Sequence, residues 1–243
     1  MSSAPAPTGW RAAAGDLLLG SSCHGCGRPA WTLCAGCRAE LAALRARPAR
    51  PEPCPAGFPP TWTAGPYGPL ARGLVSAHKD RAALALTPVL GTGLALAVLA
   101  LLDDARARGV PDLGRVVLVP VPSARRAVRE RGFDAGLALA RAAARRLPHT
   151  RAAPLLVGAR RVADQSGLGS AERHANLAGA LRVTARSWRP LPAGPVVVVD
   201  DVVTSGASLT EATRALEAAG VAVLGAATFA ATQRRQPTRD VPA

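Results

Sequence analysis

Short apolar runs rich in Val alternate with longer stretches rich in Ala, Leu and Arg through most of the chain beyond residue 70. The short runs are typical of buried strands, and the longer stretches have the composition of helices. This alternation predicts an α/β fold in which a parallel sheet is flanked by helices on both faces. The expected strands are 116–121, 155–157, 196–199 and 221–229, and the expected helices are 134–147 and 208–219.

The stretch 82–102 carries no charged side chain over about the ~20 residues that a membrane-spanning helix needs. Because it contains Thr87, Pro88 and Gly91, we expect a largely buried helix after Pro88 that ends at Asp103-Asp104, and no membrane span. No secretory signal opens the chain, since the first apolar run is only Leu17-Leu18-Leu19. These features predict a cytoplasmic location.

A proline-rich segment, 47–69, precedes the alternating region. Its prolines are too many for a helix or a central strand, so it is interpreted as a linker or wrapping segment. The expected organisation is therefore an N-terminal module at 1–46, the linker at 47–69, an α/β domain at 70–232 and a flexible tail at 233–243.

The chain has a formal net charge of +14, which would ordinarily indicate a polyanionic partner. Lys79 is the only lysine, Asn176 is the only asparagine and isoleucine is absent, which is typical of a GC-rich coding bias. Much of the arginine excess follows from that bias. The hydrophobic content of 49% is enough for a sizeable core.

Four of the five cysteines form two C-x-x-C knuckles, Cys23–Cys26 and Cys34–Cys37. Two knuckles offer the four thiolates of a tetrahedral zinc site, which has no open position for catalysis and is therefore structural. Disulfides are the alternative, but they are disfavoured in a cytoplasmic chain. His24 and Cys54 are possible alternative ligands, but neither is expected to bind the metal. Little apolar sequence surrounds the knuckles, so bound metal is expected to fold this module.

Adjacent carboxylates, Asp200 and Asp201, follow the apolar run 196–199 and precede a Thr/Ser/Gly turn that opens a predicted helix. Backbone N–H groups at a helix N-terminus bind phosphate, and Gly206 allows the backbone to approach it closely. The carboxylates can accept hydrogen bonds from vicinal hydroxyls and help to place Mg²⁺. Phosphate beside a diol predicts a ribose 5-phosphate site.

This segment resembles the signature of type I phosphoribosyltransferases, which bind phosphoribosyl pyrophosphate (PRPP) with Mg²⁺. The resemblance implies catalytic roles for Asp200 and Asp201. It implies that PRPP is bound by Asp200, Asp201, Val202, Val203, Thr204, Ser205, Gly206, Ala207 and Ser208.

Nearly the whole chain resembles the ComF family, which joins a zinc module to this fold and is associated with DNA uptake and competence in bacteria. The block from Val119 to Phe133 implies a pyrophosphate turn at Ser123, Arg125 and Arg126. Arginine binds diphosphates with parallel hydrogen bonds. The mobile hood and its surroundings correspond to Lys79, Arg131, Gln165, Arg173 and Asn176. Arg131 is alternatively an anchor of its turn, and Lys79 alternatively makes a salt bridge to the core.

Three positions depart from the patterns of these families. Asp134-Ala135 replaces an amide pair, and Asp134 is expected to cap the next helix. Val162 replaces a threonine of the hood block. Thr204 stands where enzymes that act on 6-oxopurines have an aspartate, so hypoxanthine and guanine are disfavoured as acceptors.

Two functions remain open from the sequence. One is Mg²⁺-dependent transfer of a phosphoribosyl group from PRPP to a nitrogen nucleophile. The other is a non-catalytic PRPP or nucleotide sensor that contacts single-stranded DNA or proteins of the competence machinery. Aromatic residues are only 3% of the chain, so a platform for stacking bases is not visible. An oligomer is compatible with the sequence.

Overall fold

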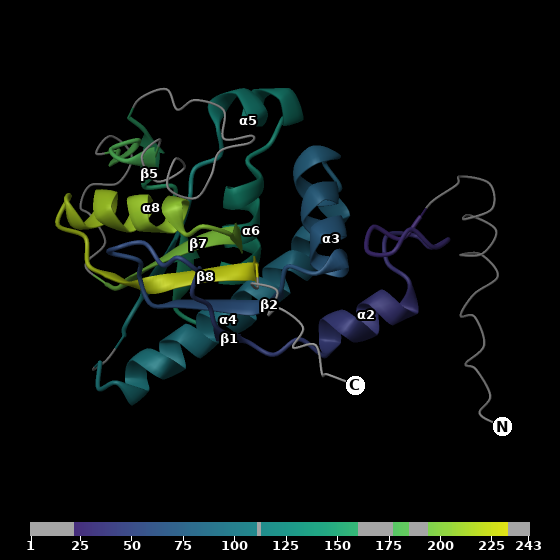
Figure 1. The fold of residues 1–243 in the computed structure, drawn as a ribbon, viewed down its shortest axis with the longest axis horizontal. Helices are drawn as coiled ribbons and strands as arrows, with labels where there is room; N and C mark the ends of the chain where they lie inside the picture. Colours follow the sequence, from purple (N-terminus) through teal and green to yellow (C-terminus); the bar gives the residue numbers. More distant parts are fainter. Residues whose placement is uncertain (1–21, 111–112, 160–176, 185–193, 233–243) are drawn as a thin grey trace, which may run out of the picture.

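The computed structural model describes residues 22–110, 113–159, 177–184 and 194–232. A six-stranded sheet in the order β1-β2-β8-β7-β3-β4 forms its centre, and every neighbouring pair is parallel except β1 with β2 (Figure 1). The fold is α/β with a mostly parallel sheet flanked by helices, as the apolar pattern predicts. The strands are β1 (Arg47–Pro48), β2 (Thr61–Pro66), β3 (Val116–Pro120), β4 (Thr150–Ala152), β7 (Val196–Val203) and β8 (Val223–Ala231).

Helices cover both faces of the sheet, and alternate residues of each central strand belong to different layers of the core. Val197 and Val199 of β7 pack with α4 (Thr87–Ala107) and α6 (Ala135–Ala144). Val196 and Val198 pack with α8 (Ala207–Glu217). The other helices of the described residues are α2 (Ala35–Ala42), α3 (Pro69–Asp80), α5 (Arg125–Arg131) and the short 3-10 helix η1 (Leu84–Leu86).

Helix α4 is the one described helix that is long and apolar enough to cross a membrane. Its contacts explain its composition, because it packs on α6, β8 and β2. Added Cβ atoms at Gly91 and Gly93 would lie 2.5 Å from Ala142 and 2.6 Å from Phe229. The helix is therefore a core element, as expected, although it continues past Asp103-Asp104 to Ala107.

The proline-rich segment differs from its prediction. Residues 61–66 form β2, which pairs in parallel with β8 inside the sheet, so the expectation of a linker without a central strand is wrong there. The prolines flank β2 or stand at its last residue, where no interior ladder bond is lost. Thr61, Thr63 and Ala64 are buried, and burial outweighs the composition of the flanks.

A separate two-stranded antiparallel sheet, β5 (Leu156–Gly158) with β6 (Leu181–Val183), stands beside α8 and is called the hairpin below. Residues 155–157 were expected to join the parallel sheet, but β5 pairs antiparallel with β6. The strand that continues the main sheet beyond β3 is β4, at its edge. Its three residues are too few for the apolar pattern to reveal.

Candidate functional site

The Thr/Ser/Gly loop predicted to bind phosphate follows β7 at the carboxyl end of the sheet. Gly206, with a φ of 78°, turns the chain into α8, and an added Cβ would lie 2.8 Å from Phe58 and 2.9 Å from Pro51. The loop and the first turn of α8 line a cavity of about 290 Å³ together with Asp200. Because the amides of this turn lie at the positive end of the helix dipole, the cavity suits a phosphate. Its lining residues include Val202, Val203, Thr204, Ser205, Gly206, Ala207 and Ser208.

The two adjacent carboxylates have different surroundings. Asp200 lines the loop cavity, whereas Asp201 forms an ion pair with Lys79 of α3, in which Nζ lies 2.6 Å from Oδ2. The backbone N–H of Asp201 donates to Oδ1 of Asp200. Of the two roles left open for Lys79, the structure shows the salt bridge. It places the sole lysine directly on the acidic pair.

Burial raises the pKa of Asp200 to about 7, and the charge of Asp201 adds to this effect while Lys79 opposes it. Burial disfavours the charge of Lys79, but Asp201 and Asp200 outweigh it and raise the lysine's pKa. The adjacent His78 is buried, which lowers its pKa, and its Nε2 lies 2.9 Å from the Thr87 hydroxyl. The acidic pair therefore holds a proton near neutral pH unless a cation replaces it.

This shift predicts how the stability of the metal-free protein depends on pH. Unfolded Asp200 releases its proton near ~4, whereas the folded protein holds it up to about 7. In this window the folded state binds more protons, so the free energy of unfolding falls as the pH rises from ~4 to about 7. Denaturant melts of the wild type and of Asp200→Asn at several pH values in this range measure the free energy of unfolding. If that free energy depends on pH equally in the two proteins, the raised pKa does not belong to Asp200.

A second, larger cavity of about 1070 Å³ lies beside the loop and shares Ser208 with its lining. The turn after β3, the hairpin and α8 enclose it. Arg125, Arg129 and Arg182 line it, and within the described ranges none of them has an ion-pair partner. The walls can therefore bind anions. Its other lining residues include Ser123, Arg126, Gly158, Leu177, Leu181 and Glu211.

In a comparison with protein families, residues 134–242 match the model of the phosphoribosyl transferase domain. This part of the chain is therefore similar to phosphoribosyl transferase domains. A search of curated proteins finds no match. The match begins after β3, but β2 and β3 belong to the same sheet as β7 and β8.

The predicted pyrophosphate turn lines the arginine-lined cavity, so Ser123, Arg125 and Arg126 are brought together with Ser208 in the first turn of α8. Ser123 donates to Asp134, which also caps α6 by accepting from the amide of Leu137, as expected. Arg126 pairs with Glu130 at 2.6 Å on the surface of α5.

Arg131 anchors its turn, which was one of its two predicted roles. Its guanidinium donates to the carbonyl of Ala127 and, across to α3, to the carbonyl of Lys79 at 3.1 Å. Phe133 stacks edge to face on His78, with ring centroids 5.5 Å apart. The R-G-F block therefore braces the helix that carries Lys79.

The hood block lies outside the described residues. Gln165, Arg173 and Asn176 fall in the range 160–176, as does Val162. Their roles stay predictions.

Two groups of residues that support the candidate site were missed from the sequence. Phe58 and Pro51 of the proline-rich segment pack under Gly206, and Glu211 of α8 is a buried carboxylate near the cavity wall. Glutamate in an amphipathic helix is typical of a solvated face, so pattern alone gives no signal for Glu211. The proline-rich composition likewise conceals the packing of Phe58.

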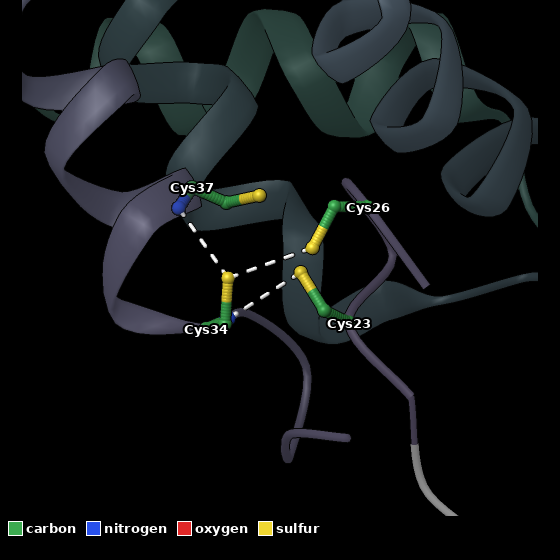
Figure 2. Close-up of side chains that lie close together, drawn as sticks. All are labelled: Cys23, Cys26, Cys34 and Cys37. Atoms are coloured by element: carbon green, nitrogen blue, oxygen red, sulfur yellow. Dashed lines mark hydrogen bonds between the residues drawn. The ribbon is translucent and has the colours of Figure 1, made fainter. Parts of the chain in front are cut away.

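The four predicted metal ligands gather at one point. The Sγ atoms of Cys23, Cys26, Cys34 and Cys37 all lie within 4.8 Å of one another (Figure 2). Four sulfurs ~2.3 Å from a zinc ion lie about 3.8 Å apart, so the cluster fits zinc with little movement. The amide of Cys34 donates to Sγ of Cys23, and that of Cys37 to Sγ of Cys34. Such bonds stabilise thiolates, and Cys54 is not part of the cluster.

The cysteine module shares the core of the main domain, which its sparse apolar sequence did not predict. Cys23, Leu33 and Cys37 are buried in the same hydrophobic cluster as Leu70 and Leu74 of α3. An added Cβ at Gly25 would lie 2.5 Å from Leu70. Helix α3 therefore touches the four-cysteine cluster with its first half and the acidic pair with its last turn.

Proposed function

We propose that the protein binds PRPP and, with Mg²⁺, transfers its phosphoribosyl group to a nitrogen nucleophile. The observation that carries the proposal is the pair of adjoining cavities: a phosphate loop with Asp200 on one side and an arginine-lined wall on the other, joined at Ser208. PRPP has a phosphate at one end and a diphosphate at the other. The similarity to phosphoribosyl transferase domains supports the same ligand class.

Each part of the site has a task in this reaction. The backbone amides and hydroxyls of Thr204, Ser205 and Ser208 would hold the 5-phosphate. Asp200 would accept a hydrogen bond from the ribose diol, and Lys79 would keep Asp201 ionised. Ser123, Arg125 and Arg126 would bind the pyrophosphate. Mg²⁺, when bound, would neutralise the oxygens of the leaving group.

In the chemical step the C1–O bond to pyrophosphate breaks and its electron pair leaves with the pyrophosphate. The lone pair of the acceptor nitrogen forms the new C1–N bond, and the nitrogen loses a proton to solvent. Positive charge develops on the ribosyl ring between these events. The carboxylates beside the diol would stabilise this charge electrostatically.

The proposal also concerns the family, the cellular role and the location of the protein. The four-cysteine cluster together with the similarity to phosphoribosyl transferase domains supports placement in the ComF family, with a role in DNA uptake and a cytoplasmic location. The thiols of the cluster are free, which suits a reducing compartment.

Phosphorus NMR of PRPP and Mg²⁺ with the purified protein tests the transfer reaction. Samples with and without a pool of bases or single-stranded DNA are compared. Pyrophosphate that appears only with an acceptor establishes a transferase. Shifted PRPP signals without pyrophosphate would leave the protein a PRPP sensor, and a DNA-dependent change in those shifts would indicate a nucleic-acid partner.

Replacement of Lys79 by Met is expected to weaken PRPP binding about tenfold at neutral pH, or ~1.4 kcal/mol. Without the ammonium, the buried acidic pair holds its proton more tightly and is less available to the ligand. The side chain of Lys79 is 38% exposed, which limits the effect. Titration calorimetry compares it with Arg81→Met, at the exposed end of the same helix. Equal affinities for the two variants would exclude the role of Lys79.

A further inference from the structure

Glu211 is a buried charge that the proposed mechanism does not use. It lies in the second turn of α8, after the phosphate loop, and is 4% exposed. Its carboxylate accepts from Nε of Arg214 at 2.7 Å and from a terminal nitrogen of Arg214 at 2.8 Å. Such a paired geometry is among the strongest that two side chains form.

The pair holds the backbone of a different element. Glu211 accepts from the N–H of Leu181 at 2.9 Å, and Arg214 donates to the carbonyl of the same residue at 3.2 Å. Leu181 begins β6, so both of these backbone groups of the hairpin are bound by α8. Burial opposes the charge of Glu211, but the hydrogen bonds from Arg214 and Leu181 outweigh it and lower its pKa.

The hairpin depends on contacts with the main domain, because it forms its own two-stranded sheet and isolated two-stranded hairpins are marginally stable in water. Leu156 is buried in a core cluster with Leu209 of α8, and Leu181 and Val183 pack against that cluster. A small apolar cluster of Leu177, Ala180 and Ala207 adds a second contact, at the first residue of α8. Arg182, next to the clamped residue, lines the arginine cavity.

We propose that Glu211 and Arg214 are positioning residues that clamp the β5–β6 hairpin to the helix of the phosphate loop. The clamp fixes the arginine-bearing wall of the large cavity relative to the loop. A ligand that spans both cavities then stabilises the hairpin, whereas an anion bound to the loop alone does not need it. This extension rests on the proposed function for its ligand, but the clamp itself does not.

Glu211→Gln keeps the shape of the side chain and removes its charge, and Glu217→Gln is the matched control on the exposed last turn of the same helix. Hydrogen exchange of peptides covering 177–184 is expected to be at least tenfold faster in Glu211→Gln than in the wild type, without ligand. Glu217→Gln should match the wild type. Arg214→Gln, at a half-exposed side chain, gives the same test if Glu211→Gln does not fold.

Titration calorimetry then distinguishes a positioning role of Glu211 from a general disturbance of the site. Glu211→Gln is expected to bind PRPP with Mg²⁺ about tenfold more weakly but to bind inorganic phosphate as the wild type does. Exchange in Glu211→Gln equal to that in Glu217→Gln overturns the clamp, as does an equal loss of affinity for PRPP and phosphate. If the wild type does not bind PRPP, the proposed function is wrong. Hydrogen exchange without ligand still tests whether Glu211 holds the hairpin.

Discussion

Asp200→Asn/Asp201→Asn is expected to weaken PRPP binding at least 100-fold and to abolish any transfer. The double variant removes Asp200, which lines the loop cavity, and Asp201, which forms the ion pair with Lys79. Each charge-assisted hydrogen bond that the ligand loses contributes ~1.5–3 kcal/mol. Titration calorimetry with PRPP and Mg²⁺ measures the binding, and phosphorus NMR measures the transfer.

Loss of fold would not explain that result. Burial raises the pKa of Asp200 to about 7, so its charged form costs folding free energy that Asn does not. Asp200→Asn alone, which keeps the ion pair of Asp201 with Lys79, should therefore melt at or above the temperature of the wild type at pH 8, and it separates a loss of binding from a loss of fold. Asp103→Asn, on the exposed side of α4, is the control and should bind normally. PRPP binding by the double variant at wild-type strength would remove the acidic pair from the site.

Cys37→Ser is expected to release the zinc that the wild-type protein is proposed to hold, one ion per chain, and to lower the free energy of unfolding by several kcal/mol. Three thiolates leave the tetrahedron open, and metal binding contributes directly to folding in sites of this kind. Because the module packs on Leu70 and Leu74, the loss should also loosen α3. Elemental analysis and thermal melts check both effects.

Cys54→Ser is the matched control, since Cys54 lies outside the cluster. It should retain zinc and the wild-type melting temperature. A chelator should reproduce the effect of Cys37→Ser on the wild type and add nothing to that variant. Wild-type protein that contains no zinc, or a Cys37→Ser variant as stable as Cys54→Ser, would contradict a structural metal site.

The parts of the fold that follow from local pattern could be predicted from the sequence. The wholly apolar run of β7 indicated a strand buried on both faces, and the cysteine spacing indicated a single cluster. Asp134 was expected as a helix cap because its neighbours already indicated a helix. In each case the residue types that determine the feature lie next to one another in the chain.

The parts that depend on distant partners could not be predicted. Strand β2 is a strand because β8 lies beside it, and its own proline-rich flanks indicated the opposite. The ion pair of Lys79 with Asp201 joins residues 122 positions apart, and the clamp of Glu211 needs Leu181 from another element. Such contacts follow from the topology of the sheet, which composition and periodicity do not specify.

The central claim is that the loop and the arginine-lined cavity together form one PRPP site. Calorimetry of the wild-type protein with PRPP, ribose 5-phosphate and pyrophosphate, each with Mg²⁺, tests it most directly. The account predicts that PRPP binds more tightly than either smaller ligand, because only PRPP occupies both cavities, and that the preference vanishes in Asp200→Asn/Asp201→Asn. No binding of PRPP, or equal affinity for PRPP and pyrophosphate, would contradict it.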